Sequence, residues 1–182
     1  MVPYLSELGY ALDTVDPSTR RRGWPPQSDW NEWGFLDYAA AGWARHSWNC
    51  TLDALPSDVQ FDGLYCLSVI EHLVAEDRRA LVQEMARRTR PGGFVVLTID
   101  LVRDSNDLWN RASGRIVEAP KRHGRMKDVI SEAKGAGLDT VESRTIRGWG
   151  KVPVDIGFLV MKRGESGAPK RTLKQRLTKT HR

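Results

Sequence analysis

The chain has 182 residues, of which 40% are hydrophobic, and a formal net charge of +5. This length suits one domain with a core of its own, and no stretch approaches the roughly 18 consecutive apolar residues that a membrane-spanning helix needs. The sequence therefore favours a soluble, cytoplasmic protein without a membrane span or a secretory leader, and it leaves the oligomeric state open.

The first elements expected are a helix within residues 1–9, which Gly9 would end, and a short strand over residues 11–15 that leads into Asp16. A polar, tryptophan-rich segment follows, whose aromatic side chains are expected to cover an edge of the sheet. A short helix is predicted over residues 35–44 and a further strand over residues 46–51.

A strand-helix-strand unit is expected between residues 61 and 100. Leu64–Leu67 and Phe94–Ile99 are short apolar runs typical of buried strands, and a Pro-Gly-Gly turn introduces the second run. Between them, apolar residues recur at helical spacing from Leu73 to Ala86. The unit implies parallel strands with a right-handed crossover. The tetrapeptide Ser68–Glu71 matches a capping box, which gives Glu71 a structural role.

The chain after this unit is expected to contain one helix and two strands. Residues 101–121 are polar and irregular, with Trp109 as the expected apolar anchor. A helix is predicted over residues 126–136, where glycines end it. Strands over residues 138–146 and 154–161 are joined by a short glycine-bearing link, which predicts an antiparallel pair.

The positive charge is concentrated at the carboxyl terminus. Residues 165–182 hold six Lys or Arg residues and one acid, a balance that equals the whole net charge. Residues 1–164 are therefore expected to form the folded domain, and residues 165–182 a disordered basic tail. Weak contact of this tail with nucleic acid phosphates is one possible role for it.

Several kinds of chemistry have no support in the sequence. Cys50 and Cys66 fit no zinc or redox spacing and are expected to be buried free thiols, and no metal site is expected. There is no nucleophile elbow and no phosphate-binding Gly-Lys-Ser/Thr loop, so hydrolase and nucleoside-triphosphatase functions are not indicated.

The stretch from Phe61-Asp62 to Glu71-His72, followed by Pro-Gly-Gly and an apolar strand, resembles the second half of a class I S-adenosylmethionine-dependent methyltransferase. The resemblance implies a Rossmann-like α/β fold, with a mostly parallel sheet, helices on both faces and a C-terminal antiparallel hairpin at the edge. It also implies S-adenosylmethionine as cofactor and methyl transfer to an unidentified acceptor, most simply a small molecule. The alternative is a non-catalytic methyltransferase-like remnant that acts as a binding or scaffold domain.

The resemblance also assigns residues to the cofactor. Asp16 would bind the ribose, because a carboxylate can accept hydrogen bonds from two adjacent hydroxyls. Family members usually place an acid near the adenine at the end of the next strand, where this chain has Thr51. Either Asp53 takes that role, or the backbone of Thr51 and Leu52 does.

Further candidates follow the strand that ends at Leu67. Leu67 and Ser68 would lie under the cofactor, because ligands of open α/β sheets bind at the carboxyl ends of the strands. His72 is the candidate catalytic base near the acceptor, since an imidazole titrates near neutral pH; the alternative for His72 is a structural role.

The glycine-rich loop of such folds precedes the ribose acid by about 20 residues, a position that falls before Met1. The resemblance is therefore expected to begin at the helix after that loop. Three explanations are open: the sequence starts late relative to the natural protein, another chain supplies the missing strand, or the domain is a remnant that no longer binds the cofactor.

Overall fold

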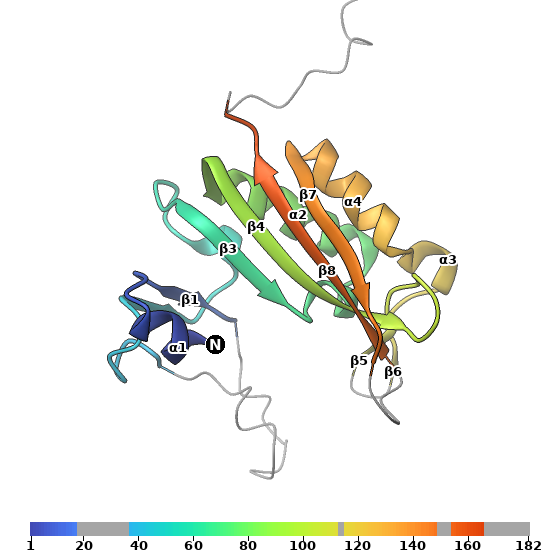
Figure 1. Cartoon of the computed structure of the whole chain (residues 1–182), viewed down its shortest axis with the longest axis horizontal. Helices are drawn as coiled ribbons and strands as arrows, with labels where there is room; N and C mark the ends of the chain where they lie inside the picture. The colour runs from blue at the N-terminus through green and yellow to red at the C-terminus, as the bar shows by residue number, and fades with distance from the viewer. Residues whose placement is uncertain (18–36, 113–114, 149–153, 166–182) are drawn as a thin grey trace, which may run out of the picture. The chain divides into compact units, whose positions relative to one another are not determined.

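The computed structural model describes residues 1–17, 37–112, 115–148 and 154–165 (Figure 1). It divides into two units, residues 1–59 and 60–182, and each unit is described by itself. Most of the tryptophan-rich segment and of the basic tail lies outside the described residues, so the predictions for them are not tested.

The first unit contains a short helix and two paired strands. Helix α1 spans Val2–Glu7, and Gly9 follows it with a φ of 85°, a conformation that favours glycine and ends the helix as predicted. Strand β1 (Asp13–Val15) pairs in parallel with β2 (His46–Trp48), and a 3-10 turn, η2 (Leu52–Ala54), comes next. Both predicted strands are confirmed, although β2 ends three residues earlier than expected.

The helix predicted over residues 35–44 is wrong where the chain is described, because residues 38–42 form turns. The carboxylate of Asp37 accepts a hydrogen bond from the Ala40 N–H at 2.9 Å, and the Ser47 hydroxyl accepts one from the Ala39 N–H at 2.9 Å. The Asp37 bond is of the N-cap type and supports one turn, in which the Ala41 N–H donates to the Asp37 carbonyl at 3.2 Å, but Gly42 then has a φ of 78°. The segment therefore turns instead of continuing as a helix.

The second unit is built on a four-stranded sheet with the order β3-β4-β8-β7. Its strands are β3 (Phe61–Leu67), β4 (Thr89–Val102), β7 (Leu138–Ile146) and β8 (Val154–Arg163). Strands β3 and β4 are parallel, whereas β8 is antiparallel to both β4 and β7. The predicted parallel unit and the predicted antiparallel terminal pair are both confirmed, and the terminal strand lies between β4 and β7.

Two helices lie on one side of this sheet (Figure 1). Helix α2 contacts β4, helix α4 contacts β7, and the two helices contact each other. The helical and short-strand elements of the unit are η3 (Ile70–His72), α2 (Ala75–Arg88), β5 (Arg111–Ala112), β6 (Arg115–Ile116), α3 (Pro120–His123) and α4 (Met126–Gly135). None of the described helices is long and apolar enough to cross a membrane.

The core lies between these helices and one face of the sheet. Alternate residues of β4 from Val95 to Leu101 are fully buried, as are Leu159 and Met161 of β8. The opposite face is more open, because Tyr65 is 56% exposed and Phe94 is 42% exposed. Strand β3 is half-buried or exposed rather than fully buried as expected, since it is the edge strand of the described four-stranded sheet.

Candidate functional site

The parallel strands β3 and β4 bring two polar side chains together where β3 ends. Ser68 follows β3 with a φ of 50°, which is uncommon for a residue other than glycine. Its N–H donates to the Thr98 carbonyl at 2.9 Å, and its hydroxyl donates to Asp100 Oδ1 at 3.1 Å. The chain therefore leaves the sheet sharply while Ser68 stays hydrogen-bonded to β4.

The predicted capping box at Ser68–Glu71 is wrong. Val69 is the N-cap of η3 and provides no side-chain cap, while Glu71 is fully buried and its Oε1 accepts the N–H of Asp100 at 3.0 Å. Because β3 has ended by this point, the Asp100 N–H on that side has no strand partner, and Glu71 supplies the acceptor. Glu71 thus joins η3 to the end of β4.

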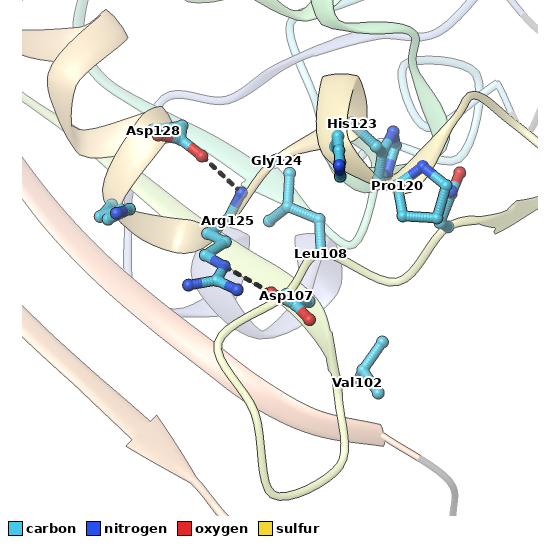
Figure 2. A pocket seen from close by; sticks show the side chains of 11 residues that line it. Val102, Asp107, Leu108, Pro120, His123, Gly124, Arg125 and Asp128 are labelled. Carbon is cyan, nitrogen blue, oxygen red and sulfur yellow. Dashed lines mark hydrogen bonds and ion pairs between the residues drawn. The ribbon is translucent and has the colours of Figure 1, made fainter.

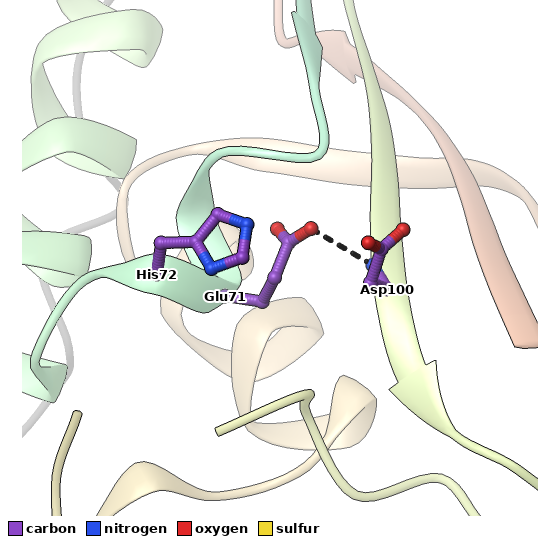
Figure 3. Close-up of side chains that lie close together, drawn as sticks. All are labelled: Glu71, His72 and Asp100. Carbon is purple, nitrogen blue, oxygen red and sulfur yellow. Dashed lines mark hydrogen bonds between the residues drawn. The ribbon is translucent and has the colours of Figure 1, made fainter. Parts of the chain in front are cut away.

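His72 completes a three-residue cluster with Glu71 and Asp100. Its Nδ1 lies 3.1 Å from the carbonyl oxygen of Arg111. One ligand-type atom from each of the three residues lies within 4.8 Å of the others. Figure 3 shows the Glu71 carboxylate between the imidazole and Asp100, and its second oxygen, Oε2, has no hydrogen-bond partner among the described residues.

Burial controls the electrostatics of this cluster. Removal from water raises the pKa of Glu71 to about 7, with a smaller contribution from the charge of Asp100 and against the opposing effect of backbone N–H donors. Burial and the nearby Glu71 also raise the pKa of the Cys66 thiol to about 12. Cys50 and Cys66 are free, as expected, but they are half-buried instead of fully buried, and Cys66 stays protonated.

A pocket of about 480 Å³ lies beside the loop that follows β4 (Figure 2). Asp107 pairs with Arg125 at 2.7 Å, and Asp128 accepts the Arg125 N–H at 2.8 Å. The apolar anchor of this loop is Leu108, which is 1% exposed, and not the half-buried Trp109. Leu108 forms an isolated antiparallel β-bridge with Leu101, which places its side chain in the core.

His123 lines the same pocket from the end of α3. Its side chain is buried, and neither ring nitrogen makes a well-formed hydrogen bond within the described residues. Burial, and then the charge of Arg78, lower the pKa of His123, against the opposing effect of the carbonyls of Glu71 and Trp109. His123 is therefore neutral near pH 7.

The candidate residues of the first unit lie at or just after the carboxyl ends of β1 and β2. Val15 pairs with Trp48, so β1 and β2 end together, and the N–H of Asp16 donates to the Trp48 carbonyl at 3.0 Å. Asp16 is exposed. Thr51, Leu52 and Asp53 follow β2 within or next to η2, with Thr51 and Asp53 exposed.

Leu67 and Ser68, the other cofactor candidates, belong to the second unit, where they adjoin the Glu71 cluster. Sequence reasoning missed Asp100 and gave Glu71 a different role. Asp100 directly follows the apolar run that ends at Ile99, and the rule that ligands bind at the carboxyl ends of parallel strands would have indicated it. The hydrogen bond from the Asp100 N–H to Glu71 depends on strand pairing, so no local sequence pattern indicates it.

Comparisons with known proteins agree with this fold. Residues 38–97 match the family described as "Methyltransferase domain", and no curated protein matches. Among solved structures, the N-methyltransferase NodS from Bradyrhizobium japonicum WM9, in complex with S-adenosylhomocysteine, is 18% identical with a TM-score of 0.53. The match covers 84% of this chain and 66% of NodS, so the chain spans just under two thirds of that relative.

Two further structures match over a larger share of their length. The 1,6-didemethyltoxoflavin-N1-methyltransferase of Burkholderia thailandensis is 14% identical, with a TM-score of 0.58 and coverage of 90% of this chain and 76% of that one. A SAM-dependent methyltransferase from Methanosarcina mazei is 12% identical, with a TM-score of 0.59 and coverage of 88% and 85%. The chain therefore has a Rossmann-like α/β fold similar to that of these methyltransferase structures, and its match to the methyltransferase family covers residues 38–97.

Proposed function

We propose that this chain carries out S-adenosylmethionine-dependent methyl transfer to a small-molecule acceptor. The observation that carries the proposal is the parallel β3–β4 unit with polar residues at its carboxyl edge, most of it within the segment that matches the methyltransferase family. The similar structures of NodS and of the 1,6-didemethyltoxoflavin-N1-methyltransferase contain S-adenosylhomocysteine, the product of such a reaction.

In this proposal, Asp16 binds the ribose hydroxyls of S-adenosylmethionine. Asp53, or the backbone of Thr51 and Leu52, binds the adenine. Leu67 and Ser68 form the floor of the site. The parallel pairing within each unit supports this assignment, because it gathers each group at the carboxyl edge of its strands, where open α/β sheets bind ligands.

The reaction is an in-line displacement at the methyl carbon. An electron pair of the acceptor forms the new bond to carbon while the carbon–sulfur bond breaks, and S-adenosylhomocysteine leaves with that bonding pair. The protein contributes mainly by holding donor and acceptor in line. Where the acceptor carries a proton, His72 is the proposed base: donation from Nδ1 to the Arg111 carbonyl leaves Nε2 able to accept that proton.

The proposal is tested by calorimetric titration of the full chain with S-adenosylmethionine and S-adenosylhomocysteine. Hydrogen bonds to a charged group contribute about 1.5 to 3 kcal/mol, so Asp16→Ala should weaken binding at least about tenfold. The matched control is Asp58→Ala, another exposed acid of the same unit, which should bind like the wild type.

Two results would contradict the proposal. A folded, monodisperse chain that binds neither compound would favour the non-catalytic scaffold instead. Equal losses in the Asp16 and Asp58 variants would mean that general surface charge, not a ribose contact, controls binding.

A further inference from the structure

We propose that Glu71, His72 and Asp100 form a binding site for a divalent transition-metal ion, such as Mn²⁺ or Zn²⁺. The three side chains come from η3 and from the carboxyl-terminal part of β4, and their candidate ligand atoms lie within 4.8 Å of one another (Figure 3). The metal site does not require the proposed methyl transfer, although the two share His72 and Ser68, and the sequence contains no spacing pattern that indicates it.

The first argument is the state of Glu71. Its side chain is fully buried, yet Oε2 has no hydrogen-bond partner within the described residues. A buried acceptor without a partner is costly, and native structures rarely leave one unexplained. A cation next to Oε2 would supply the missing partner, and Figure 3 shows that this carboxylate lies between the His72 ring and Asp100.

The second argument is that a hydrogen bond orients each of the three side chains. The Arg111 carbonyl accepts from His72 Nδ1 at 3.1 Å, which leaves the lone pair of Nε2 available. The Ser68 hydroxyl donates to Asp100 Oδ1 at 3.1 Å, and the Asp100 N–H donates to Glu71 Oε1 at 3.0 Å. Outer hydrogen bonds of this kind hold the ligands of protein metal sites in position.

The chemistry of the three groups selects the kind of ion. Carboxylate oxygens suit Mn²⁺ as well as Mg²⁺ and Ca²⁺, whereas an imidazole favours transition metals and Zn²⁺. Ligand bonds of about 2.0–2.2 Å place neighbouring ligand atoms roughly 3–3.5 Å apart, so any pair of these atoms near the 4.8 Å limit must move closer when an ion binds. Two carboxylates balance the charge of a divalent ion, and three protein ligands leave positions open for water or a ligand.

This site changes the role of His72. The Nε2 lone pair that would bind a metal is the one that a catalytic base would use for a proton. The two roles therefore exclude each other while an ion is bound.

The test begins with the full chain freed of metal by a chelator and titrated calorimetrically with Zn²⁺ or Mn²⁺ near neutral pH. We expect one ion per chain, with affinity lowered at least tenfold in Glu71→Gln and in Asp100→Asn. Ser68→Ala, which removes only an outer hydrogen bond, should lower affinity by about tenfold. The control Asp139→Asn, an exposed acid on β7, should leave affinity unchanged.

A second readout identifies the imidazole ligand directly. Pulsed electron paramagnetic resonance of the Mn²⁺-loaded chain should show coupling to a nitrogen nucleus, and His72→Gln should abolish it. If Glu71→Gln does not fold by circular dichroism, the His72 variant decides the question. Two results would overturn the proposal: a folded wild-type chain that binds neither ion at millimolar concentration, or variants of Glu71, His72 and Asp100 that bind as the wild type does.

Discussion

Asp155, at the start of β8, connects two loops to the sheet. It is 4% exposed, and its carboxylate accepts the N–H of Gly148 at 2.9 Å and that of Asp104 at 2.9 Å. The N–H of Gly148, then that of Asp104, and the charges of Arg103 and Arg147 hold the pKa of Asp155 below its usual range, although burial opposes them. The folded state therefore favours the ionised carboxylate.

The stability that Asp155 contributes should depend on pH. A carboxyl group whose pKa is lowered on folding contributes fully above its unfolded pKa, near 3.9, and loses that contribution as the pH falls through the folded value. Asp155→Asn should lower the Tm at neutral pH and reduce the loss of Tm on acidification below about pH 4. Thermal unfolding by circular dichroism measures both, with Asp139→Asn as control. An acid-induced loss of the same size in wild type and Asp155→Asn would contradict the prediction.

Gly93 allows β3 and β4 to approach closely where their pairing begins. A Cβ at this position would lie 2.6 Å from the carbonyl oxygen of Asp62 and 2.9 Å from Thr89 Cγ2. Gly93→Ala must therefore move backbone, and we expect a loss of about 1–3 kcal/mol in the free energy of unfolding, measured in urea. Gly135→Ala is the control, because no atom outside its chain neighbours and its own helix backbone lies within 4 Å of its Cβ position. Equal effects of the two substitutions would contradict this steric explanation.

At the residue scale, the sequence predicted part of the candidate site. Leu67 and Ser68 were found because the end of a buried strand can be read from an apolar run. The role of Glu71 was not predicted, because a local pattern indicated a capping box. Its actual partner, the Asp100 N–H, lies 29 positions away. Such partners are set by strand pairing, which a single sequence does not specify.

At the scale of elements, Arg78 joins α2 to α4 and to the segment between them. Its guanidinium makes two hydrogen bonds to Glu132, at 2.8 and 2.9 Å, and a third to the His123 carbonyl at 2.6 Å. The exposed fractions of the Arg78 and Glu132 side chains are 2% and 14%. The pair is therefore largely buried. In such a setting, removal of one partner leaves the charge of the other unbalanced.

Arg78→Ala should lower the free energy of unfolding by about 3–5 kcal/mol, because Glu132 would lose its partner in a buried setting. The double variant Arg78→Met with Glu132→Leu should lose less, since no unpaired charge is left behind. Arg87→Ala, on the same helix but half exposed, should change the Tm little. Urea unfolding distinguishes these outcomes, and a double variant as unstable as Arg78→Ala would contradict the explanation.

The elements that the sequence predicted well are those with a strong local signal. The α4 helix has apolar residues at helical spacing and a glycine stop, and the β7–β8 pair has a short glycine-bearing link. The helix expected before β2 is replaced by turns over residues 38–42, where Gly42 adopts a φ of 78° that does not continue a helix. Strand β4 begins at Thr89, before the Pro-Gly-Gly turn signal, because Thr89 pairs with Phe61 of β3.

At the scale of the whole molecule, the fold class followed from the family resemblance, together with the strand-helix-strand order of residues 61–100. The sequence predicted an antiparallel terminal pair, but it did not indicate that β8, and not β7, pairs with β4. That choice depends on residues far apart in the chain, such as Phe94 opposite Lys162. A pattern read in one short window carries no information about such a pairing.

The insertion of β8 between β4 and β7 has a consequence for the order of folding during synthesis. Until β8 has emerged from the ribosome, β4 and β7 each present an edge whose hydrogen-bonding groups have no strand partner on that side. Closing contacts between residues so far apart in sequence is intrinsically slow, and an unpaired strand edge can pair with another chain in the meantime. The nascent chain therefore passes through a vulnerable interval that ends only when its last described strand is inserted into the middle of the sheet.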